Sequence, residues 1–342
     1  MIKIVMLALG LSVLSVGIAP AQGAGGEPVP VTTDNFARAA SDTRFGSVVN
    51  QGGFGKLVNQ QHPMSINDQT VVRANRDLIH STGVFDLDAG PVTVTLPDPG
   101  KRFLSMTVFD EDHHIPAVVY GAGRDTFSKE QVGTRYAMFD VRIMVDPEDP
   151  ADIARVNQLQ AGLAVQQQAA GSFEVPNWDQ ASLKIERDKL LATAGTLPDL
   201  KGAFGSKAEV DPVRHLAGTA VQWGGDPEKY GLYVGFIPEK NNSTAIYKLR
   251  AKDVPVDAFW SVTLYNADGF FTSNPLNAYS LSSMTAKKGG DGTVAIQFGG
   301  CDGVVANCLP TVPGWNYMVR LYRPRAEVLN GTWKFPQAQL VQ

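Results

Sequence analysis

The alternation of hydrophobic and polar positions predicts a chain built mainly of short strands. Between residues 70 and 121, runs rich in Val, Thr and Phe are separated by Asp-Ala-Gly-Pro and Pro-Asp-Pro-Gly. Gly and Pro at such positions set turn dihedrals and end strand pairing, so this segment predicts antiparallel strands. The expected strands are Val71–Val72, Val84–Leu87, Val92–Leu96, Phe103–Phe109 and Ala117–Tyr120, followed by Thr134–Val145.

Three segments have the helical period instead. Residues 33–49 place apolar side chains at helical spacing behind Asp34, which can cap the helix. Asp149 or Pro150 opens a second helical pattern that runs to about Gln168, and a third covers about Asp179 to Ala194. The last two predict a helical insert between two β regions.

The strand pattern returns from about Ala217 in short, evenly spaced runs. These are Tyr230–Ile237, Thr244–Leu249, Ala258–Tyr265, Thr293–Phe298 and Tyr317–Tyr322. Such spacing is typical of a β-sandwich or jelly roll. The predicted fold is therefore mainly β with a helical insert, a multi-domain α+β chain. It has an N-terminal antiparallel β domain, linking helices and a C-terminal jelly-roll-like β-sandwich.

The N-terminus predicts export. Lys3 precedes an apolar run from Ile4 to Ile18 and a small-residue Ala19-Pro20-Ala21 site, which is the pattern of a cleaved signal peptide. The run is shorter than the roughly 20 residues that a bilayer crossing needs. We therefore expect a periplasmic or secreted protein with no stable membrane span after cleavage. The expected divisions are a signal peptide (1–21), a flexible leader (22–32), the N-terminal β domain (33–148), the helical linker region (149–216) and the C-terminal domain (217–342).

Composition and net charge limit the classes of binding partner that we expect. The chain has 342 residues, is 44% hydrophobic and carries a formal net charge of −4, which suits a globular protein. There is no basic footprint, so no nucleic-acid partner is expected. We expect a small-molecule or envelope-derived substrate, with a homo-oligomer formed through the jelly roll as a further expectation. Cys301 and Cys308 predict a disulfide; a two-Cys metal site is the alternative, but no other ligand types flank the pair.

The acidic and imidazole side chains gather in the first β region. If residues 103–114 form one extended strand, Asp110, Asp112 and His114 point to one face and predict a divalent transition-metal site. The alternative is a turn at the strand end, whose carboxylates cap backbone amides. The cofactor therefore stays open.

A second constellation is Asn75-Arg76-Asp77. An adjacent Arg and Asp in a strand-rich segment are costly to bury unless both are paired, so one interpretation is a buried Arg76–Asp77 pair. The other gives Arg76 an anionic ligand group and makes Asp77 an acid or base, or the group that orients His80.

The candidate roles follow from these two clusters. The predicted catalytic residues are Asp77, His80 and His113; the predicted substrate-binding residues are Arg73, Asn75, Arg76 and Tyr120; the predicted metal ligands are Asp110, Asp112 and His114. Serine hydrolysis is disfavoured because Ser81 and His80 point to opposite faces of a strand and no Gly-x-Ser-x-Gly elbow is present.

Several long motifs resemble a known bacterial family. NRDLIHSTGVFDLDAGPVTVTLPD, FDEDHHIPAVVYGAG and GTRYAMFDVRIMVDPEDPAD resemble domain of unknown function 1254. VPVDAFWSVTLYNADGFF, NPLNAYSL and NCLPTVPGWNYMVRLYRPRAEVLNGTWKFP resemble its usual C-terminal partner, domain of unknown function 1214. The resemblance implies an envelope or secreted protein with an N-terminal β domain, helices and a jelly roll. It implies no settled reaction.

Two positions depart from the family pattern, because His80 and His114 stand where relatives commonly have Tyr. Two functional classes fit these observations. One is an envelope hydrolase acting on an amide, ester or glycosidic bond, with an Asp/His/Arg pocket that is metal-assisted in one version. The other is a non-catalytic periplasmic ligand-binding or assembly module. The density of titratable residues in one short segment favours the hydrolase.

Overall fold

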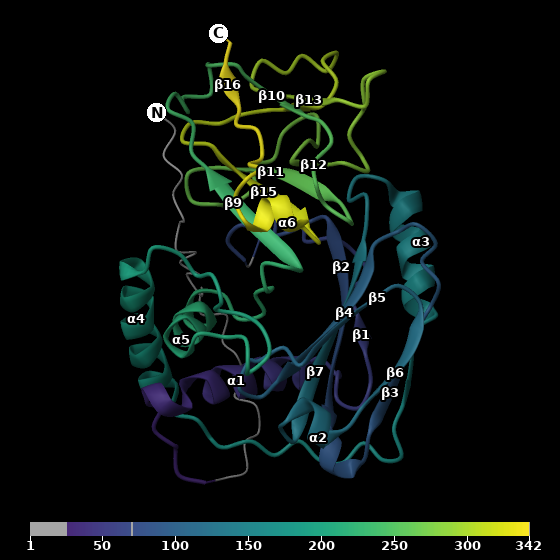
Figure 1. Ribbon diagram of the computed structural model, residues 1–342, viewed down its shortest axis with the longest axis vertical. Coiled ribbons are helices and arrows are strands. Elements are labelled where there is room, and N and C mark those ends of the chain that lie inside the picture. Colours follow the sequence, from purple (N-terminus) through teal and green to yellow (C-terminus); the bar gives the residue numbers. More distant parts are fainter. Residues whose placement is uncertain (1–25, 70, 342) are drawn as a thin grey trace.

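The computed structural model describes residues 26–69 and 71–341 and places β-sheets in two separate parts of the molecule. The C-terminal sheets lie at the top of Figure 1, while the N-terminal sheets lie below them, with helices on either side. The predicted signal peptide, residues 1–21, lies outside the described residues.

Two antiparallel sheets form the N-terminal part. The first has five strands in the order β1 (Val58–Asn59), β2 (Leu78–Asp86), β7 (Tyr136–Met144), β4 (Leu104–Asp110) and β5 (Ala117–Tyr120). The second has the order β6 (Gly123–Phe127), β3 (Val92–Leu96) and β8 (Ala164–Gln166). The two sheets share one apolar core, in which Phe139 of β7 and Val94 of β3 are fully buried. β7 is the central strand and is buried along its whole length.

Three of the helices begin at a capping carboxylate. Asp149, Asp179 and Asp211 accept backbone N–H groups at the starts of α3 (Pro150–Ala161), α4 (Gln180–Thr196) and α5 (Pro212–Val221). A small apolar cluster contains Phe36 of α1 (Phe36–Asn50) together with residues of α4 and α5. α2 (Lys129–Val132) is a single turn before β7.

The prediction that the second helix extends to about Gln168 is wrong. α3 ends at Ala161, and three of the following residues form β8. Val165 pairs with Val94 of β3, so this short strand is fixed by a partner about seventy residues earlier in the chain. Local periodicity cannot detect such pairing.

Two four-stranded sheets form the C-terminal sandwich. One has the order β14 (Cys308–Leu309), β13 (Val294–Phe298), β10 (Tyr247–Ala251) and β16 (Gln339–Leu340). The other has the order β12 (Ser280–Ser282), β11 (Trp260–Tyr265), β15 (Asn316–Tyr322) and β9 (Gly231–Phe236). Leu249, Val262 and Val319 from both sheets meet in one core. β9 is an edge strand, and α6 (Ala326–Leu329) follows β15.

The predicted fold class, mainly β with helices and several antiparallel sheets, is confirmed. The strand predicted at Val71–Val72 is wrong, because these residues form a turn. Arg73, next to it, donates its backbone N–H to Gly269 of the C-terminal sandwich, so this segment packs across the molecule rather than into the N-terminal sheet. The domain boundaries at residues 149 and 217 remain predictions.

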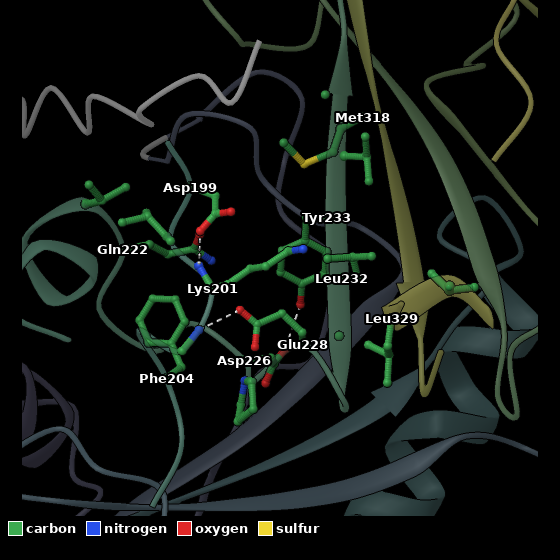
Figure 2. Close-up of a pocket in the computed structure, with 18 of the residues that line it drawn as sticks. Asp199, Lys201, Phe204, Gln222, Asp226, Glu228, Leu232, Tyr233, Met318 and Leu329 are labelled. Carbon is green, nitrogen blue, oxygen red and sulfur yellow. Dashed lines mark hydrogen bonds between the residues drawn. The ribbon is translucent and has the colours of Figure 1, made fainter. Parts of the chain in front are cut away.

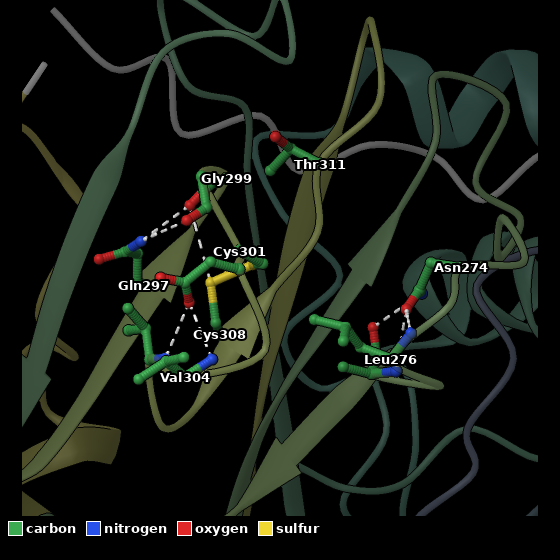
Figure 3. Close-up of a disulfide and its surroundings, with 12 residues drawn as sticks. Asn274, Leu276, Gln297, Gly299, Cys301, Val304, Cys308 and Thr311 are labelled. Carbon is green, nitrogen blue, oxygen red and sulfur yellow. Dashed lines mark hydrogen bonds between the residues drawn. A yellow bond between two sulfur atoms is a disulfide. The ribbon is translucent and has the colours of Figure 1, made fainter.

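Cys301 and Cys308 form the predicted disulfide (Figure 3). The bridge closes a loop in which Asp302 accepts the backbone N–H groups of Val304 and Val305. Among the described residues, no helix is both long enough and apolar enough to cross a membrane.

Candidate functional site

The imidazole of His80 is held against a buried carboxylate. His80 lies in β2, where it pairs with Arg142 of β7, and Asp140 lies two residues earlier on the same face of β7. The Nδ1 atom of His80 is 2.9 Å from Asp140 Oδ1. Within the part of the chain that the structure describes, Nε2 has no hydrogen-bond partner. Since the His80 side chain is about one-third exposed, Nε2 is available to an incoming group.

Asp140 connects His80 to a buried network of ion pairs. Arg142 Nε donates to Asp140 Oδ2 at 2.7 Å, and Arg142 Nη1 donates to Asp226 at 2.6 Å. Tyr233 of β9 donates its hydroxyl to the other oxygen of Asp226 at 2.6 Å. The network therefore connects the N-terminal sheet to the C-terminal sandwich.

The charges in this network determine its protonation. Burial alone would raise the pKa of Asp140, but the charges and hydrogen bonds of His80 and Arg142 outweigh burial and hold that pKa well below its ordinary value. Burial would lower the pKa of Arg142, yet Asp226 and Asp140 raise it well above the usual range. Burial and the nearby Asp226 raise the pKa of the Tyr233 phenol. The network therefore keeps Asp140 as an anion, Arg142 as a cation and Tyr233 as a neutral phenol.

A second cation lies near Asp140 without contacting it. Arg44, in α1, has an accessible side chain, yet surrounding protein lowers the pKa of its guanidinium, an effect that Asp140 partly offsets. Across the described residues it makes neither a hydrogen bond nor a contact ion pair. A guanidinium that makes no contact ion pair favours a carboxylate or phosphate ligand.

The far end of the network lines a cavity of about 800 Å³. The walls come from β9, from the segment between α4 and α5, and from α6 and the residues after it. In Figure 2, Phe204, Asp199 and Gln222 lie across the cavity from Leu232 and Leu329. The apolar residues in the lining include Leu197, Leu200, Phe204, Val221, Leu232, Val234, Phe236, Ile237, Met318, Val328 and Leu329. This size and composition are typical of a small-molecule site.

Some charged side chains on the cavity walls form ion pairs and others do not. Asp199 pairs with Arg214, Glu209 with Lys229, and Asp226 with Arg142. Lys201 and Lys334 also line the cavity. Neither lysine makes an ion pair with any residue that the structure describes. The cavity therefore combines apolar walls with two lysines that make no ion pair and with Glu228, whose carboxylate accepts the backbone N–H of Gly202.

A second cavity, of about 720 Å³, contains Tyr120. Its charged groups are largely paired with one another, since Arg102 and Arg155 both contact Asp152. The guanidinium of Arg323 lies 4.6 Å from the centre of the Tyr120 ring, and burial raises the pKa of Tyr120. Internal pairing leaves this cavity fewer free groups for a ligand.

Asp77 and Asn75 lie where the two β parts meet. Asp77 is fully buried and accepts a hydrogen bond from the hydroxyl of Ser261 in β11. Asn75 donates its amide to the Tyr322 hydroxyl at 2.6 Å. Neither residue lines the two cavities described above, so this geometry favours a structural role over the predicted catalytic and substrate-binding roles.

The predicted Arg76–Asp77 pair does not form as an ion pair. Arg76 instead pairs with Glu148 at 2.8 Å and donates to the carbonyl of Met64. Arg73 lines the 800 Å³ cavity, but its guanidinium donates to Asn316 at 2.5 Å. Of the four predicted substrate-binding residues, Arg73 and Tyr120 therefore line cavities, while Asn75 and Arg76 do not.

Both ring nitrogens of His113 are engaged. Nε2 accepts the backbone N–H of Gly224 at 2.8 Å, so Nδ1 carries the proton and donates it to Thr219 Oγ1 at 2.7 Å. The ring is fully buried and stacks on Trp223, and burial holds its pKa well below the ordinary value. This arrangement fixes a neutral imidazole in the core and leaves no nitrogen for the predicted catalytic role.

The extended strand assumed for the metal site is interrupted. β4 ends at Asp110, and a turn follows in which His113 has a φ of 65°. Asp110 accepts the backbone N–H groups of Asp112 and His114, which is the capped turn considered as the alternative. The Asp112 carboxylate points to Arg38. Among described residues, no group of three or more His, Cys, Asp or Glu side chains is arranged to hold a metal ion.

Sequence reasoning missed Arg44, Asp140, Arg142, Asp226 and Tyr233. One signal was present: Asp140 and Arg142 alternate within the apolar run Tyr136–Met144 and share one face of a wholly buried strand. Charged residues inside such a strand require partners. The partners come from elements far away in sequence, which no local pattern reveals.

Together, these features define a multi-domain, mainly β protein with a cavity beside the edge of its C-terminal sandwich. Residues 54–126 match the family model described as protein of unknown function (DUF1254), and residues 238–326 match the one described as protein of unknown function (DUF1214). The two matches occur in the expected order, and the predicted resemblance is confirmed.

One solved structure supports the same fold. The VPA0106 protein from Vibrio parahaemolyticus is similar with a TM-score of 0.68 at 18% identity, over 91% of this chain and 100% of the other. An uncharacterized protein from Burkholderia cenocepacia aligns with a TM-score of 0.48 at 12% identity, over 91% of this chain and 87% of its own. No curated protein matches the sequence.

Proposed function

We propose that this protein binds an apolar ligand with an anionic group in the 800 Å³ cavity. The observation that carries the proposal is that apolar walls and two lysines without an ion pair, Lys201 and Lys334, line the same cavity. The apolar part of a ligand gains free energy by leaving water, and an anionic group orients it toward a lysine. Export to an oxidising compartment belongs to the same proposal, supported by the disulfide.

The test uses 1-anilinonaphthalene-8-sulfonate, an apolar probe with a sulfonate. We expect saturable fluorescence enhancement, and an affinity at least fivefold lower in Lys201→Glu. Lys207→Glu is the matched control, because Lys207 is exposed in the same segment but does not line the cavity. Leu329→Asp should also weaken binding, while Val304→Asp, at an 86% exposed position outside the cavity, should not. Binding that is insensitive to both cavity variants would refute the proposal.

A second candidate is hydrolysis with His80 as general base. Its support is the imidazole of His80, which Asp140 orients and whose Nε2 has no hydrogen-bond partner among the described residues, together with Arg44, whose charge interacts with Asp140. A carboxylate on Nδ1 holds the imidazole with Nε2 ready to take a proton from water, and Arg44 would bind an anionic substrate or a developing oxyanion. The substrate would contain an amide, ester or glycosidic bond.

Hydrolysis is tested with p-nitrophenyl esters and a panel of peptide and glycoside substrates. We expect any turnover to fall at least a hundredfold in His80→Asn, with His62→Asn as the control because His62 is an exposed histidine outside the network. Turnover that survives in His80→Asn would exclude this mechanism.

A further inference from the structure

We infer that the cavity takes an extended peptide segment, which adds as a strand to the free edge of β9. This inference rests on the proposed function and specifies its ligand class. Among the described residues, β9 is the last strand of its sheet and pairs with β15 alone. Every residue from 231 to 237 lines the cavity, which is expected when the strand presents its backbone edge and not only one face.

The register of β9 shows which backbone groups are free. Arg323 donates its N–H to the carbonyl of Tyr230 at 2.9 Å, so these two directly opposite residues form a hydrogen-bonded pair. Such pairs alternate along an antiparallel ladder, and the register continues through Leu232 and Val234. The N–H and C=O groups of Tyr233 and Gly235 therefore point away from β15.

Those outward groups have no partner among the residues that the structure describes. Gly231 is different, because its N–H donates to the carbonyl of Pro227 at 3.0 Å. Tyr233 and Gly235 thus present two donors and two acceptors to the cavity, alternating along the strand. An extended peptide offers the complementary row of groups at the same spacing. A hydrocarbon chain could fill the volume but would leave these groups unsatisfied.

The cavity also accommodates the side chains of an added strand. Leu232 and Val234 lie on the core-facing side of β9, next to Val328 in the lining. Tyr233 and Met318 lie on the opposite face. Because side chains alternate along a strand, a bound peptide would place every second residue on the side of Leu232 and Val234. The residues between them would lie on the side of Tyr233 and Met318. We therefore expect the preferred peptides to carry apolar residues at both odd and even positions, with one carboxylate near Lys201.

The first experiment asks whether peptide N–H groups are needed. The probe is a pool of acetylated, amidated hexapeptides with Val at odd positions and Val, Thr, Phe or Asp at even positions. We compare its displacement of 1-anilinonaphthalene-8-sulfonate with the displacement by two modified pools. One pool is N-methylated at alternate residues and the other at all residues. A strand pairs through one edge, so we expect the alternately methylated pool to displace the probe and the fully methylated pool to be at least tenfold weaker. Equal displacement by the fully methylated pool overturns the inference.

The second experiment changes the protein. Gly235→Pro removes one outward N–H, and proline is tolerated at such edge positions. We expect displacement by the peptide pool to weaken at least tenfold, while displacement by dodecanoate stays unchanged; Gly290→Pro, in an open loop outside the cavity, is the control. If dodecanoate displaces the probe and the unmodified pool does not, the peptide inference fails and the proposed function stands. If the probe itself does not bind, both fail.

Discussion

The carboxylate of Asp77 accepts a hydrogen bond from the hydroxyl of Ser261, 184 positions later in the chain. Asp77 immediately precedes β2, and Ser261 lies in β11 of the C-terminal sandwich. Both side chains are buried. Burial raises the pKa of Asp77, while the nearby charge of Arg320 opposes that rise. The contact therefore joins the two β parts through a desolvated polar group whose loss cannot be compensated by water.

We expect Asp77→Asn to lower the free energy of unfolding by about 1–3 kcal/mol, because it weakens this buried contact and removes charge near Arg320. Urea denaturation measures the change. Asp268→Asn, at an exposed position, should stay within about 0.5 kcal/mol of the wild type. An unchanged unfolding curve together with lost hydrolysis would instead support a catalytic Asp77.

Much of the fold could be predicted because strand burial is a local signal. β3 and β5 match the predicted ranges, and β7 differs from its predicted range by a few residues at the start and one at the end. The pairing of β8 with β3 could not be predicted, since residues 164–166 have no strand pattern of their own and follow a helix. Pairing with β3, and not their own sequence, determines that these residues form a strand.

The candidate site was less predictable for the same physical reason. The sequence singled out His80, but its partner Asp140 lies sixty positions away and reaches it only through the β2–β7 register. The predicted ligand set at residues 110–114 depended on a continuous strand, and the turn after Asp110 turns the Asp112 side chain toward Arg38. A turn of this kind changes which side chains share a face.

Asp140→Asn should destabilise the protein by about 3 kcal/mol at pH 7, because Arg142 and His80 lose a buried anionic partner. The folded-state pKa of Asp140 is depressed, so its contribution is complete above the unfolded pKa of about 4 and is lost as pH falls further. Urea denaturation at pH 7 and pH 3 should therefore give a smaller difference at pH 3.

Asp88→Asn is the control for Asp140→Asn. Asp88 pairs with Lys129 at the surface, so we expect a change below about 1 kcal/mol that falls with added salt. Equal losses for the two variants would show that Asp140 contributes no more than a surface ion pair.

Replacing both Cys301 and Cys308 with Ser should cost about 2 kcal/mol. The bridge spans seven positions, and closing so short a loop removes little entropy from the unfolded chain. Thermal unfolding should show one transition at a lower Tm, with binding of 1-anilinonaphthalene-8-sulfonate unchanged because the loop does not line the cavity. Loss of the whole cooperative transition would contradict a local role for the disulfide.

Asp42 in α1 should make stability fall as pH rises. Its side chain is buried, one carboxylate oxygen has no partner within the described residues, and the other accepts the indole N–H of Trp178. Burial raises the pKa of Asp42 to about 7, with the Trp178 hydrogen bond opposing that rise. The folded state therefore holds a proton that the unfolded chain releases near pH 4. The resulting penalty grows between about pH 4 and pH 7 and then remains constant.

Asp42→Asn removes this titration and keeps the hydrogen bond from Trp178. We expect little change in the free energy of unfolding at pH 4 and stabilisation at pH 8, with an upper bound of roughly 4 kcal/mol. Asp34→Asn, at an exposed position just before the same helix, is the control and should show no such pH dependence. Urea denaturation is measured at both pH values. A difference between wild type and Asp42→Asn that is the same at pH 4 and pH 8 would contradict a raised pKa of Asp42 in the folded protein.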